Sequence, residues 1–312
     1  MTEVDQPRRN LPWIALGVVY VLWGSTYLAN RYIIVSMPPL LASGFRFMTG
    51  GVLLGLLVLV FAGPRAFGMS RAQFGTAALS GLLLPAWGNG LVIVAQSQVA
   101  SGLTALLIAS VPLYIAVLRA LTGDRPRRAT VLGVLVGAVG LALLVLVGPT
   151  GGSGGVSGNA WWGPPLVLLA GAGWATGTFA ASRMAVPANP FALATVQQLI
   201  GGTTLVVVVG TAVGERLHPA AVAPVSWWAW LYMSLFVSLG AFSAYAYALS
   251  TLPVSTVATY AYVNPVIAVL LGVVVAGERF SIMQLVGGAI VLLAVVMVIA
   301  AERSARTPAE CR

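Results

Sequence analysis

Hydrophobic residues form ten long runs along the chain, separated by short polar connections. Each run holds about 20 residues or more, and at about 1.5 Å rise per residue that length crosses a hydrocarbon layer of about 30 Å. The pattern therefore predicts an all-α membrane protein with ten transmembrane helices. Their approximate ranges are 13–33, 39–61, 73–95, 101–122, 129–148, 162–184, 190–213, 227–249, 254–276 and 282–301.

The ninth run interrupts its apolar pattern with hydroxyl, phenol and amide side chains and with a central Pro265. A purely lipid-facing helix needs none of these, and they are tolerated at membrane depth where neighbouring helices or a water-filled cavity satisfy them. Thr259 and Tyr262 share one face of this helix and are expected to line a path through the protein. Asn264 is expected to satisfy the carbonyls that the proline frees, and Tyr260 to point elsewhere.

Composition and charge support a membrane protein and narrow its partners. Of the 312 residues 59% are hydrophobic and only 7% are charged, whereas ordinary soluble domains carry about 25% charged residues. The formal net charge of +9 arises from sixteen basic residues, all Arg, that are scattered among the connections rather than massed on one face. We therefore expect no nucleic acid as a partner. The expected partners are the lipid bilayer and a small-molecule substrate, and the chain is compatible with a monomer.

The arginines instead predict how the chain is oriented. With a cytoplasmic N-terminus, twelve fall inside, three fall outside and Arg46 lies within a span, in keeping with the enrichment of basic residues in cytoplasmic connections. We therefore expect a multi-pass protein of a bacterial-type inner membrane with both termini cytoplasmic. The arginines on the outside would be Arg31, Arg216 and Arg279.

The two halves of the chain repeat one another. Matches occur in order at offsets that drift only from 151 to 154, which indicates a duplication. The matched positions are Trp23 with Trp174, Pro39 with Pro190, Gly50 and Gly51 with Gly201 and Gly202, Pro112 with Pro265, Gly123 to Arg125 with Gly277 to Arg279, and Gly133 with Gly287.

Five helices per half is an odd number, so the second half must enter the membrane from the opposite side. Such an inverted repeat is typical of secondary transporters, which bind near the midplane and alternate access between two sides. The glycine-rich connection is a linker rather than a phosphate loop, because no GK[ST] follows it. The expected boundaries are a cytoplasmic tail at 1–12, repeats at 13–148 and 162–301, the linker at 149–161 and a second cytoplasmic tail at 302–312.

Several short motifs add to this pattern. They are WGSTYLANR from Trp23 to Arg31, FRF from Phe45 to Phe47, GNG around Asn89, SGLTALLIASVPL from Ser101 to Leu113, and YAYVNPVIAVLLG followed by GER. Together they resemble the drug/metabolite transporter superfamily and, more narrowly, its EamA-domain exporters of the YedA-like type, over about residues 13–300. The resemblance implies two inverted five-helix repeats around a central cavity, cytoplasmic termini and efflux of small metabolites or drugs. In one departure, Asp124 replaces the glutamate that many such repeats have, as the second half does at Glu278.

Polar and aromatic residues within the runs are candidate substrate contacts. Trp23, Tyr27 and Asn30 share one face of the first helix with i, i+4 and i+7 spacing, and this face is polar where lipid would favour aliphatic side chains. Trp174 and Thr178 repeat the pattern in the second half. The alternative for these residues is an interfacial aromatic belt and helix packing.

Arg46 lies about seven residues into the second helix, where a cation costs about 2.5–3.5 kcal/mol on insertion scales. Three roles are open: it could snorkel to the interface, pair with backbone carbonyls, or attract an anionic group of a substrate. Its repeat mate Gln197, next to Gln198, keeps polarity at that depth without charge.

The third helix contains Pro85, Trp87 and Asn89 among glycines, a combination that predicts a loosened or kinked helix. Asn89 needs a hydrogen-bond partner and is expected to face the bundle or the cavity, with Trp87 beside it. The candidate kinks that could serve as gates are Pro85, Pro112 and Pro265.

Other chemistry is sparsely supported. The single His218 lies in a connection, and the seven acidic residues all fall in tails, connections or helix ends. The single Cys311 excludes an intrachain disulfide and a Cys-based metal site. We therefore expect no enzyme activity, no metal site and no cofactor. With no carboxylate at the midplane, Glu278 is expected to be a helix-end residue near Arg279 rather than a proton carrier.

These features predict a secondary transporter that exports small amphipathic metabolites, such as amino acids, aromatic compounds or drugs, by alternating access. Uptake or bidirectional facilitation has the same sequence features as export. An alternative from another class is a non-transporting membrane scaffold, which would not need an inverted repeat.

Overall fold

The computed structural model describes residues 10–124, 126–147, 161–252, 254–257 and 259–306. Most of the expected tails, most of the linker and Cys311 lie outside these residues. Within the described part of the chain every regular element is a helix, so the all-α prediction is confirmed.

Helices cover each of the ten predicted runs, and two short 3-10 helices, η1 and η6, lie in connections between runs. In the first half these are α1 (Leu11–Gly24), α2 (Thr26–Ile33), α3 (Pro39–Ala62), η1 (Pro64–Phe67), α4 (Arg71–Gly81), η2 (Leu82–Asn89), α5 (Gly90–Ala95), α6 (Ser101–Ile108), α7 (Val111–Leu121) and α8 (Arg128–Val147). In the second half they are α9 (Gly163–Arg183), α10 (Pro190–Thr203), η5 (Thr204–Gly210), α11 (Thr211–Val213), η6 (Pro219–Ala221), α12 (Pro224–Tyr232), η7 (Met233–Ala241), α13 (Phe242–Thr251), α14 (Val254–Val257), α15 (Tyr260–Ala276) and α16 (Ile282–Arg306).

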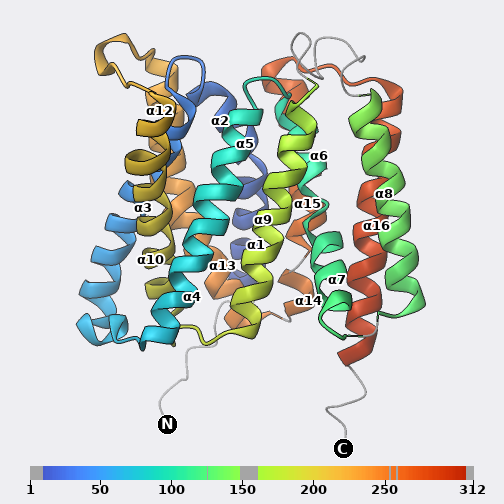
Figure 1. Cartoon of the computed structure of the whole chain (residues 1–312), viewed down its shortest axis with the longest axis horizontal. Helices are drawn as coiled ribbons and strands as arrows, with labels where there is room; N and C mark the ends of the chain where they lie inside the picture. The colour runs from blue at the N-terminus through green and yellow to red at the C-terminus, as the bar shows by residue number, and fades with distance from the viewer. Residues whose placement is uncertain (1–9, 125, 148–160, 253, 258, 307–312) are drawn as a thin grey trace, which may run out of the picture.

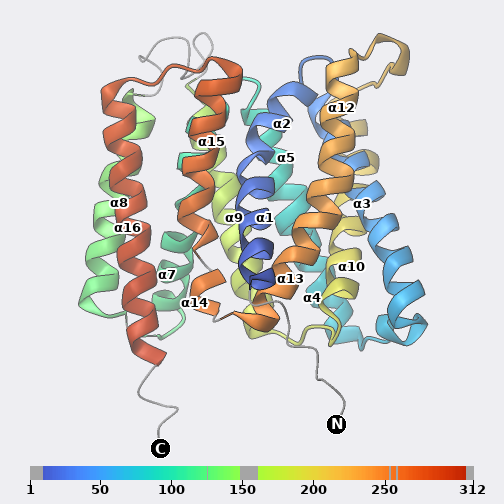
Figure 2. The same ribbon diagram turned by 180° about the vertical axis from the view of Figure 1, so that it is seen from behind.

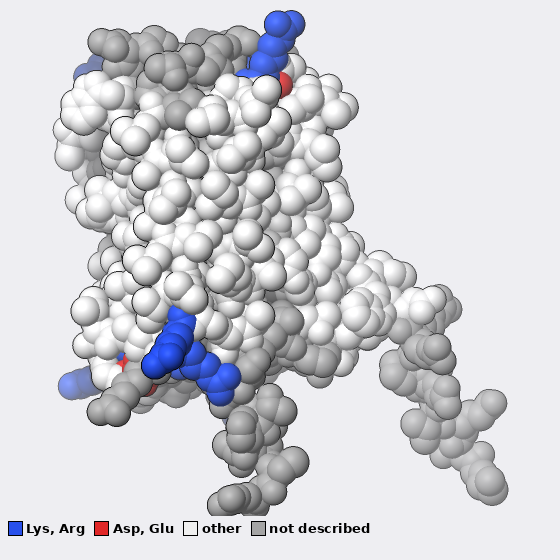
Figure 3. All heavy atoms as spheres, turned by 90° about the vertical axis from the view of Figure 1, so that its right-hand side faces the viewer, with Lys and Arg blue, Asp and Glu red and all other residues white. Residues whose placement is uncertain are grey.

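Seven helical stretches of the described chain are long and apolar enough to cross a membrane. They are Leu11–Ile33, Pro39–Ala62, Arg71–Ala95, Ser101–Leu121, Arg128–Leu146, Pro190–Val213 and Ile282–Ala301. On the lateral face formed by α8 and α16, the charged side chains gather near the two ends and leave an uncharged belt between them (Figure 3). This distribution is that of a multi-pass membrane protein.

The helices run along a common direction between two ends of the bundle. The lower end in Figure 1 holds the start of α1 and the last turn of α16, whereas the upper end holds the connection from α15 to α16. Both views place α8 and α16 side by side at one extreme of the long axis, away from α3 and α10 (Figures 1 and 2). We use "lower end" and "upper end" in this sense below.

Local sequence explains where several helices begin. Pro39 and Pro190, matched in the repeat, lie in the first turn of α3 and α10, where the missing N–H of proline would be unpaired in any case. Asn189 caps α10 by accepting from the backbone N–H of Phe191 at 2.9 Å. At the start of α4, Ser70 and Gln73 form a capping box.

Prolines act differently in the two halves. Pro112 lies just after the break between α6 and α7, as predicted. Pro265, in contrast, lies inside the unbroken α15, and the interruption in that run comes earlier, between Val257 and Tyr260. A proline inside a helix removes one backbone hydrogen bond and can bend the helix without ending it, so the kink expected at Pro265 stays a prediction.

Three stretches widen into π-helical segments, namely η2, η5 and η7. Pro85 lies within η2, so the prediction of a loosened third helix is confirmed. A π segment carries an extra residue within the turn and recurs at functional sites in membrane and soluble helices.

Glycines allow the closest helix contacts. A Cβ atom added to Gly202 of α10 would lie 2.8 Å from the carbonyl oxygen of Gly44 of α3. Likewise, a Cβ on Gly140 of α8 would lie 3.0 Å from the carbonyl oxygen of Gly287 of α16. Backbone contact through small residues is the usual packing device between membrane helices, which lack a hydrophobic driving force toward one another.

Candidate functional site

Three aromatic rings from three helices pack together. Trp23 of α1 lies with its ring centroid 5.0 Å from that of Tyr245 of α13 and 4.9 Å from that of Tyr260 of α15. Tyr245 and Tyr260 are 5.8 Å apart and nearly perpendicular. Tilted and edge-to-face contacts at these distances are the arrangements that aromatic pairs prefer. We call these three residues the aromatic cluster.

Polar groups of the ninth run adjoin the aromatic cluster. The hydroxyl of Thr259 is hydrogen-bonded to that of Tyr20 on α1. One turn after Tyr260, Asn264 has a buried Oδ1 with no hydrogen-bond partner. The close approach of α1 depends on Gly24, since a Cβ there would lie 3.3 Å from the carbonyl oxygen of Asn264. A buried acceptor without a partner next to an aromatic cluster is a place where a ligand donor could bind.

Tyr260 and Tyr262 have different surroundings in the structure. Tyr260 belongs to the aromatic cluster, whereas Tyr262 packs against an apolar core that includes Leu106 and Val295. Thr259 caps α15 in a helical backbone conformation, and its carbonyl oxygen accepts from the backbone N–H of Val263 at 3.1 Å, so the neighbouring helices rather than a change of helical phase set these surroundings. For the same run, the expectation that Asn264 satisfies freed carbonyls is wrong, because within the described chain its side chain makes no hydrogen bond to one.

The polar groups at the end of the first run form hydrogen bonds with Gln96, which follows α5. The Nδ2 of Asn30 donates to Oε1 of Gln96 at 3.0 Å, and Nε2 of Gln96 donates to the carbonyl oxygen of Tyr27 at 2.8 Å. Asn30 is buried and Tyr27 is partly buried. This amide pair joins α2 to the residue that follows α5 and leaves Asn30 engaged in packing.

An ionic network around a buried carboxylate lies at the upper end. Glu278, which is 2% exposed, accepts a hydrogen bond from Nη1 of Arg31 at 2.6 Å. It also accepts from the backbone N–H and the hydroxyl of Ser101, both at 2.8 Å, and from the backbone N–H of Gly102 at 3.0 Å. The carboxylate thus occupies the N-terminus of α6, where helix amides and the helix dipole stabilise an anion.

A second ionic network lies at the lower end and joins α7 and the connection after it to the end of α9. Asp124 accepts a hydrogen bond from Nε of Arg119 at 3.0 Å and from Nη2 of Arg183 at 2.6 Å. The hydrogen bond from Arg119, assisted by the positive charge of Arg183, holds the pKa of Asp124 below its usual range. The carboxylate of this network is much more exposed than the one at the upper end, whereas the arginines of the two networks are similarly exposed.

Arg46 does not snorkel. It is 5% exposed, its guanidinium carbon lies 4.0 Å from the ring centroid of Phe47, and its Nη1 is 3.8 Å from Sδ of Met233. Its buried Nε has no hydrogen-bond partner. Gln197, the repeat mate, donates to the hydroxyl of Ser80 at 2.8 Å.

The remaining candidates lie apart from the aromatic cluster. Asn89 donates to the carbonyl oxygen of Leu84 at 3.1 Å and thereby stabilises η2 itself. Trp87 donates from Nε1 to the carbonyl oxygen of Leu169 at 3.1 Å, and both Trp174 and Thr178 are exposed. The structure therefore brings Trp23 and Thr259 together with Asn264, but not with the candidates of the third and sixth runs.

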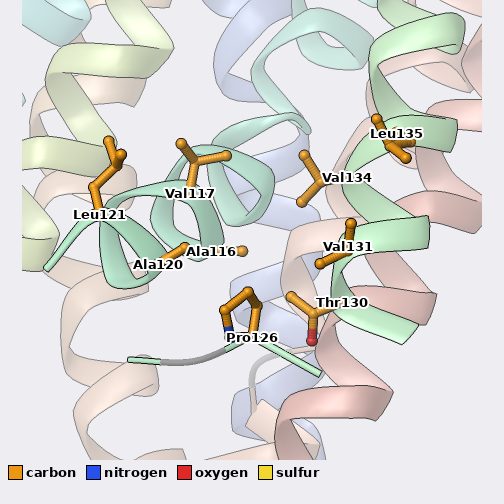
Figure 4. Close-up of a pocket in the computed structure, with 9 residues that line it drawn as sticks. All are labelled: Ala116, Val117, Ala120, Leu121, Pro126, Thr130, Val131, Val134 and Leu135. Atoms are coloured by element: carbon orange, nitrogen blue, oxygen red, sulfur yellow. The ribbon is translucent and has the colours of Figure 1, made fainter. Parts of the chain in front are cut away.

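The groove between α7 and α8 is not part of this polar site (Figure 4). Its walls come from apolar residues such as Val117, Leu121 and Val131, with Thr130 at its lower edge. It contains no candidate residue and offers almost no polar group that could orient a substrate.

The model of the EamA-like transporter family matches the chain twice, at residues 11–146 and 161–300. The chain belongs to the EamA-like transporter family. It is therefore a membrane transporter rather than an enzyme, and the resemblance seen in the sequence is confirmed.

Named relatives agree with this membership. The chain is 36% identical to the "Uncharacterized inner membrane transporter YedA" of Escherichia coli K12, over 91% of this chain and 89% of YedA. It is 26% identical to a WAT1-related chloroplastic protein of Arabidopsis thaliana, over 92% of this chain and 69% of that protein. A solved crystal structure with 20% identity superposes with a TM-score of 0.63 and covers 96% of this chain and 100% of that one, which shows a shared fold.

Sequence reasoning missed two parts of the site. Tyr245 lies two residues from Tyr247, a spacing that gives no shared helix face, and its contacts with Trp23 and Tyr260 come from other helices. The partnership of Arg31 with Glu278 joins residues 247 positions apart. A signal for it exists, since both residues fall on ends of runs that the charge pattern places on the same side of the membrane.

Proposed function

We propose that the protein is a secondary transporter that exports small amphipathic metabolites, such as amino acids, aromatic compounds or drugs, by alternating access. In this proposal ten spanning helices form inverted repeats at 13–148 and 162–301 around a central cavity, joined by the linker at 149–161, with both termini in the cytoplasm. The double match of the family model supports two repeats. The printed name of YedA supports an inner membrane location.

The relation between the two ionic networks carries the proposal. Arg31 and Arg183 are 152 residues apart (183 − 31), and Asp124 and Glu278 are 154 apart (278 − 124), which are offsets of the repeat. Each network joins an arginine of one half to a carboxylate of the other. They lie at opposite ends of the bundle (Figure 1). Equivalent closures at opposite ends are what alternating access requires, because one end must close while the other opens.

The two closures differ in this structure. The carboxylate of Glu278 is fully buried, whereas that of Asp124 is 39% exposed, and their arginine partners Arg31 and Arg183 are 40% and 47% exposed. In the proposal the upper, periplasmic end is closed and the lower, cytoplasmic end is accessible. The aromatic cluster and the unpaired Oδ1 of Asn264 would hold the substrate between them.

Transport in proteoliposomes tests the proposal. Vesicles that contain the purified protein should move at least one amino acid, aromatic metabolite or dye faster than empty vesicles. Counterflow measured with substrate loaded on either side separates export from bidirectional facilitation. If no compound of these classes moves above the empty control, the proposed function is wrong.

Trp23→Leu is expected to lower transport about tenfold or more, because it removes both ring contacts that hold Tyr245 and Tyr260 in the aromatic cluster. The measurement is initial transport rate at matched protein abundance. Trp228→Leu is the matched control, since Trp228 is 72% exposed on α12 and should tolerate the same change. Equal losses in both variants would contradict a role of the cluster in substrate contact.

A further inference from the structure

A second polar cluster lies buried between α3, α10 and η7. Four of the six buried side-chain atoms that lack a hydrogen-bond partner in the described chain belong to it. They are Nε of Arg46, Oγ of Ser234, and Nε2 and Oε1 of Gln198. All three residues are at most 5% exposed. Unpaired polar groups at this depth are costly and call for a partner that the chain itself does not supply.

Contacts on α3 bring Arg46 and Gln198 to one region, which Ser234 adjoins as the chain neighbour of Met233. Gly50 follows Arg46 by one turn on the same helix face. A Cβ on Gly50 would lie 2.6 Å from Oε1 of Gln198 and 3.0 Å from Oγ of Ser238. Arg46 itself contacts Met233, the neighbour of Ser234 on η7. Arginine, amide and hydroxyl groups from three helices therefore border the face of α3 that Arg46 and Gly50 share.

The guanidinium of Arg46 has no anionic partner in the described chain, where the ion pairs involve Glu278 and Asp124. Met233 Sδ is a weak acceptor, and the Phe47 ring offers only a cation–π contact. A buried cation of this kind is strongly stabilised by a carboxylate, which fits the planar donor fork of arginine.

An apolar core connects the aromatic cluster with η7. Trp23 packs against the core to which Met233 and Val237 belong, α1 contacts η7, and Met233 of η7 also contacts Arg46. A molecule with an apolar body toward Trp23 and a carboxylate toward Arg46 would use both regions.

We propose that Arg46, Gln198 and Ser234 form a carboxylate subsite of the transport site, so that the substrates are amphipathic monocarboxylates. This inference rests on the proposed transport function and deepens it. Arg46 donates to the carboxylate, Ser234 and the amide of Gln198 donate further hydrogen bonds, and the negative charge compensates the buried guanidinium.

Binding of a matched pair of probes to the full-length protein in detergent tests the subsite. Phenylacetate and phenylacetamide share the ring and differ in the charge of the head group. By calorimetry we expect phenylacetate to bind at least about tenfold tighter at pH 7, in keeping with the strength of charge-assisted hydrogen bonds. Acetate alone should bind much more weakly, because it lacks the apolar body.

Variants test whether the preference for phenylacetate depends on the residues of the carboxylate subsite. Arg46→Gln should bring the two affinities to within about twofold, whereas Arg65→Gln, the same change at an exposed arginine, should leave the preference intact. If Arg46→Gln does not fold, Ser234→Ala serves instead and should weaken phenylacetate severalfold without affecting phenylacetamide. A carboxylate preference that survives both Arg46→Gln and Ser234→Ala overturns the subsite.

The outcomes separate this inference from the proposed function. If proteoliposomes transport phenylacetamide or benzylamine as well as phenylacetate, the protein is a transporter but the carboxylate subsite is wrong. If phenylacetate binds in an Arg46-dependent way and no compound is transported, the subsite stands and the transport proposal fails.

Discussion

Replacing Glu278 with glutamine is expected to lower transport at least about tenfold and to open the upper end of the bundle. The carboxylate accepts hydrogen bonds from Arg31, from Ser101 and from Gly102. In glutamine one of the two acceptor oxygens is replaced by an NH2 group, which would face one of these donors without being able to accept from it. Removing one partner of a buried charge pair costs about 3–5 kcal/mol. The lower part of that range applies here, because the side chain of Arg31 is 40% exposed.

Opening is measured with a cysteine at Ala100, beside the network, in a Cys311→Ser background. Labelling by a membrane-impermeant maleimide should become several times faster in Glu278→Gln. Asp124→Asn, at the matched position of the other repeat, is the control and should not accelerate labelling at Ala100. Unchanged labelling in Glu278→Gln would contradict closure of the upper end by this network.

Gly202→Leu is expected to give little or no folded protein. A Cβ at Gly202 would lie 2.8 Å from both the carbonyl oxygen of Gly44 and the backbone nitrogen of Met48, and backbone atoms cannot move aside as a flexible side chain can. Overpacking of a tight interior typically costs about 1–3 kcal/mol, and separation of α3 from α10 would add lost contacts. Even Gly202→Ala should lower the unfolding temperature, as measured by thermal denaturation of the purified protein.

Gly75→Ala provides the matched control. Gly75 lies in α4, and a Cβ there would have no atom within 4 Å. Alanine is also the better helix former, so this variant should fold as well as the parent. A similar loss of folded protein in the Gly75 and Gly202 variants would mean that helix glycines matter for a reason other than close backbone contact.

The hydrophobic runs predicted the helices because a single apolar segment of this length can satisfy its own backbone hydrogen bonds in a bilayer only as a helix. The positions of Pro39 and Pro190 in first turns follow from the same local chemistry. What periodicity could not predict is which neighbouring helix each face of α15 meets. Tyr260 meets Trp23 of α1, whereas Tyr262 packs against the apolar core that includes Leu106.

Contacts between distant residues were the other part that the sequence did not reveal. The sequence around Glu278 and Arg279 indicates only a helix-end residue. The partners of Glu278 in the structure, Arg31 and Ser101, come from the opposite half of the chain. Arg46 shows the converse. The free-energy cost of a charged side chain within a membrane span indicated a special role for Arg46. Its actual neighbours, however, depend on how η7 packs against α3.

The carboxylate of Glu278 also links opening of the upper end to water. While it covers the backbone N–H groups of Ser101 and Gly102, these two amides at the first turn of α6 are paired. Any motion that withdraws the end of α15 uncovers these groups, and they cannot remain unpaired within a membrane protein. Water must enter as the carboxylate leaves, so separation of the two halves and hydration of this helix terminus are one event.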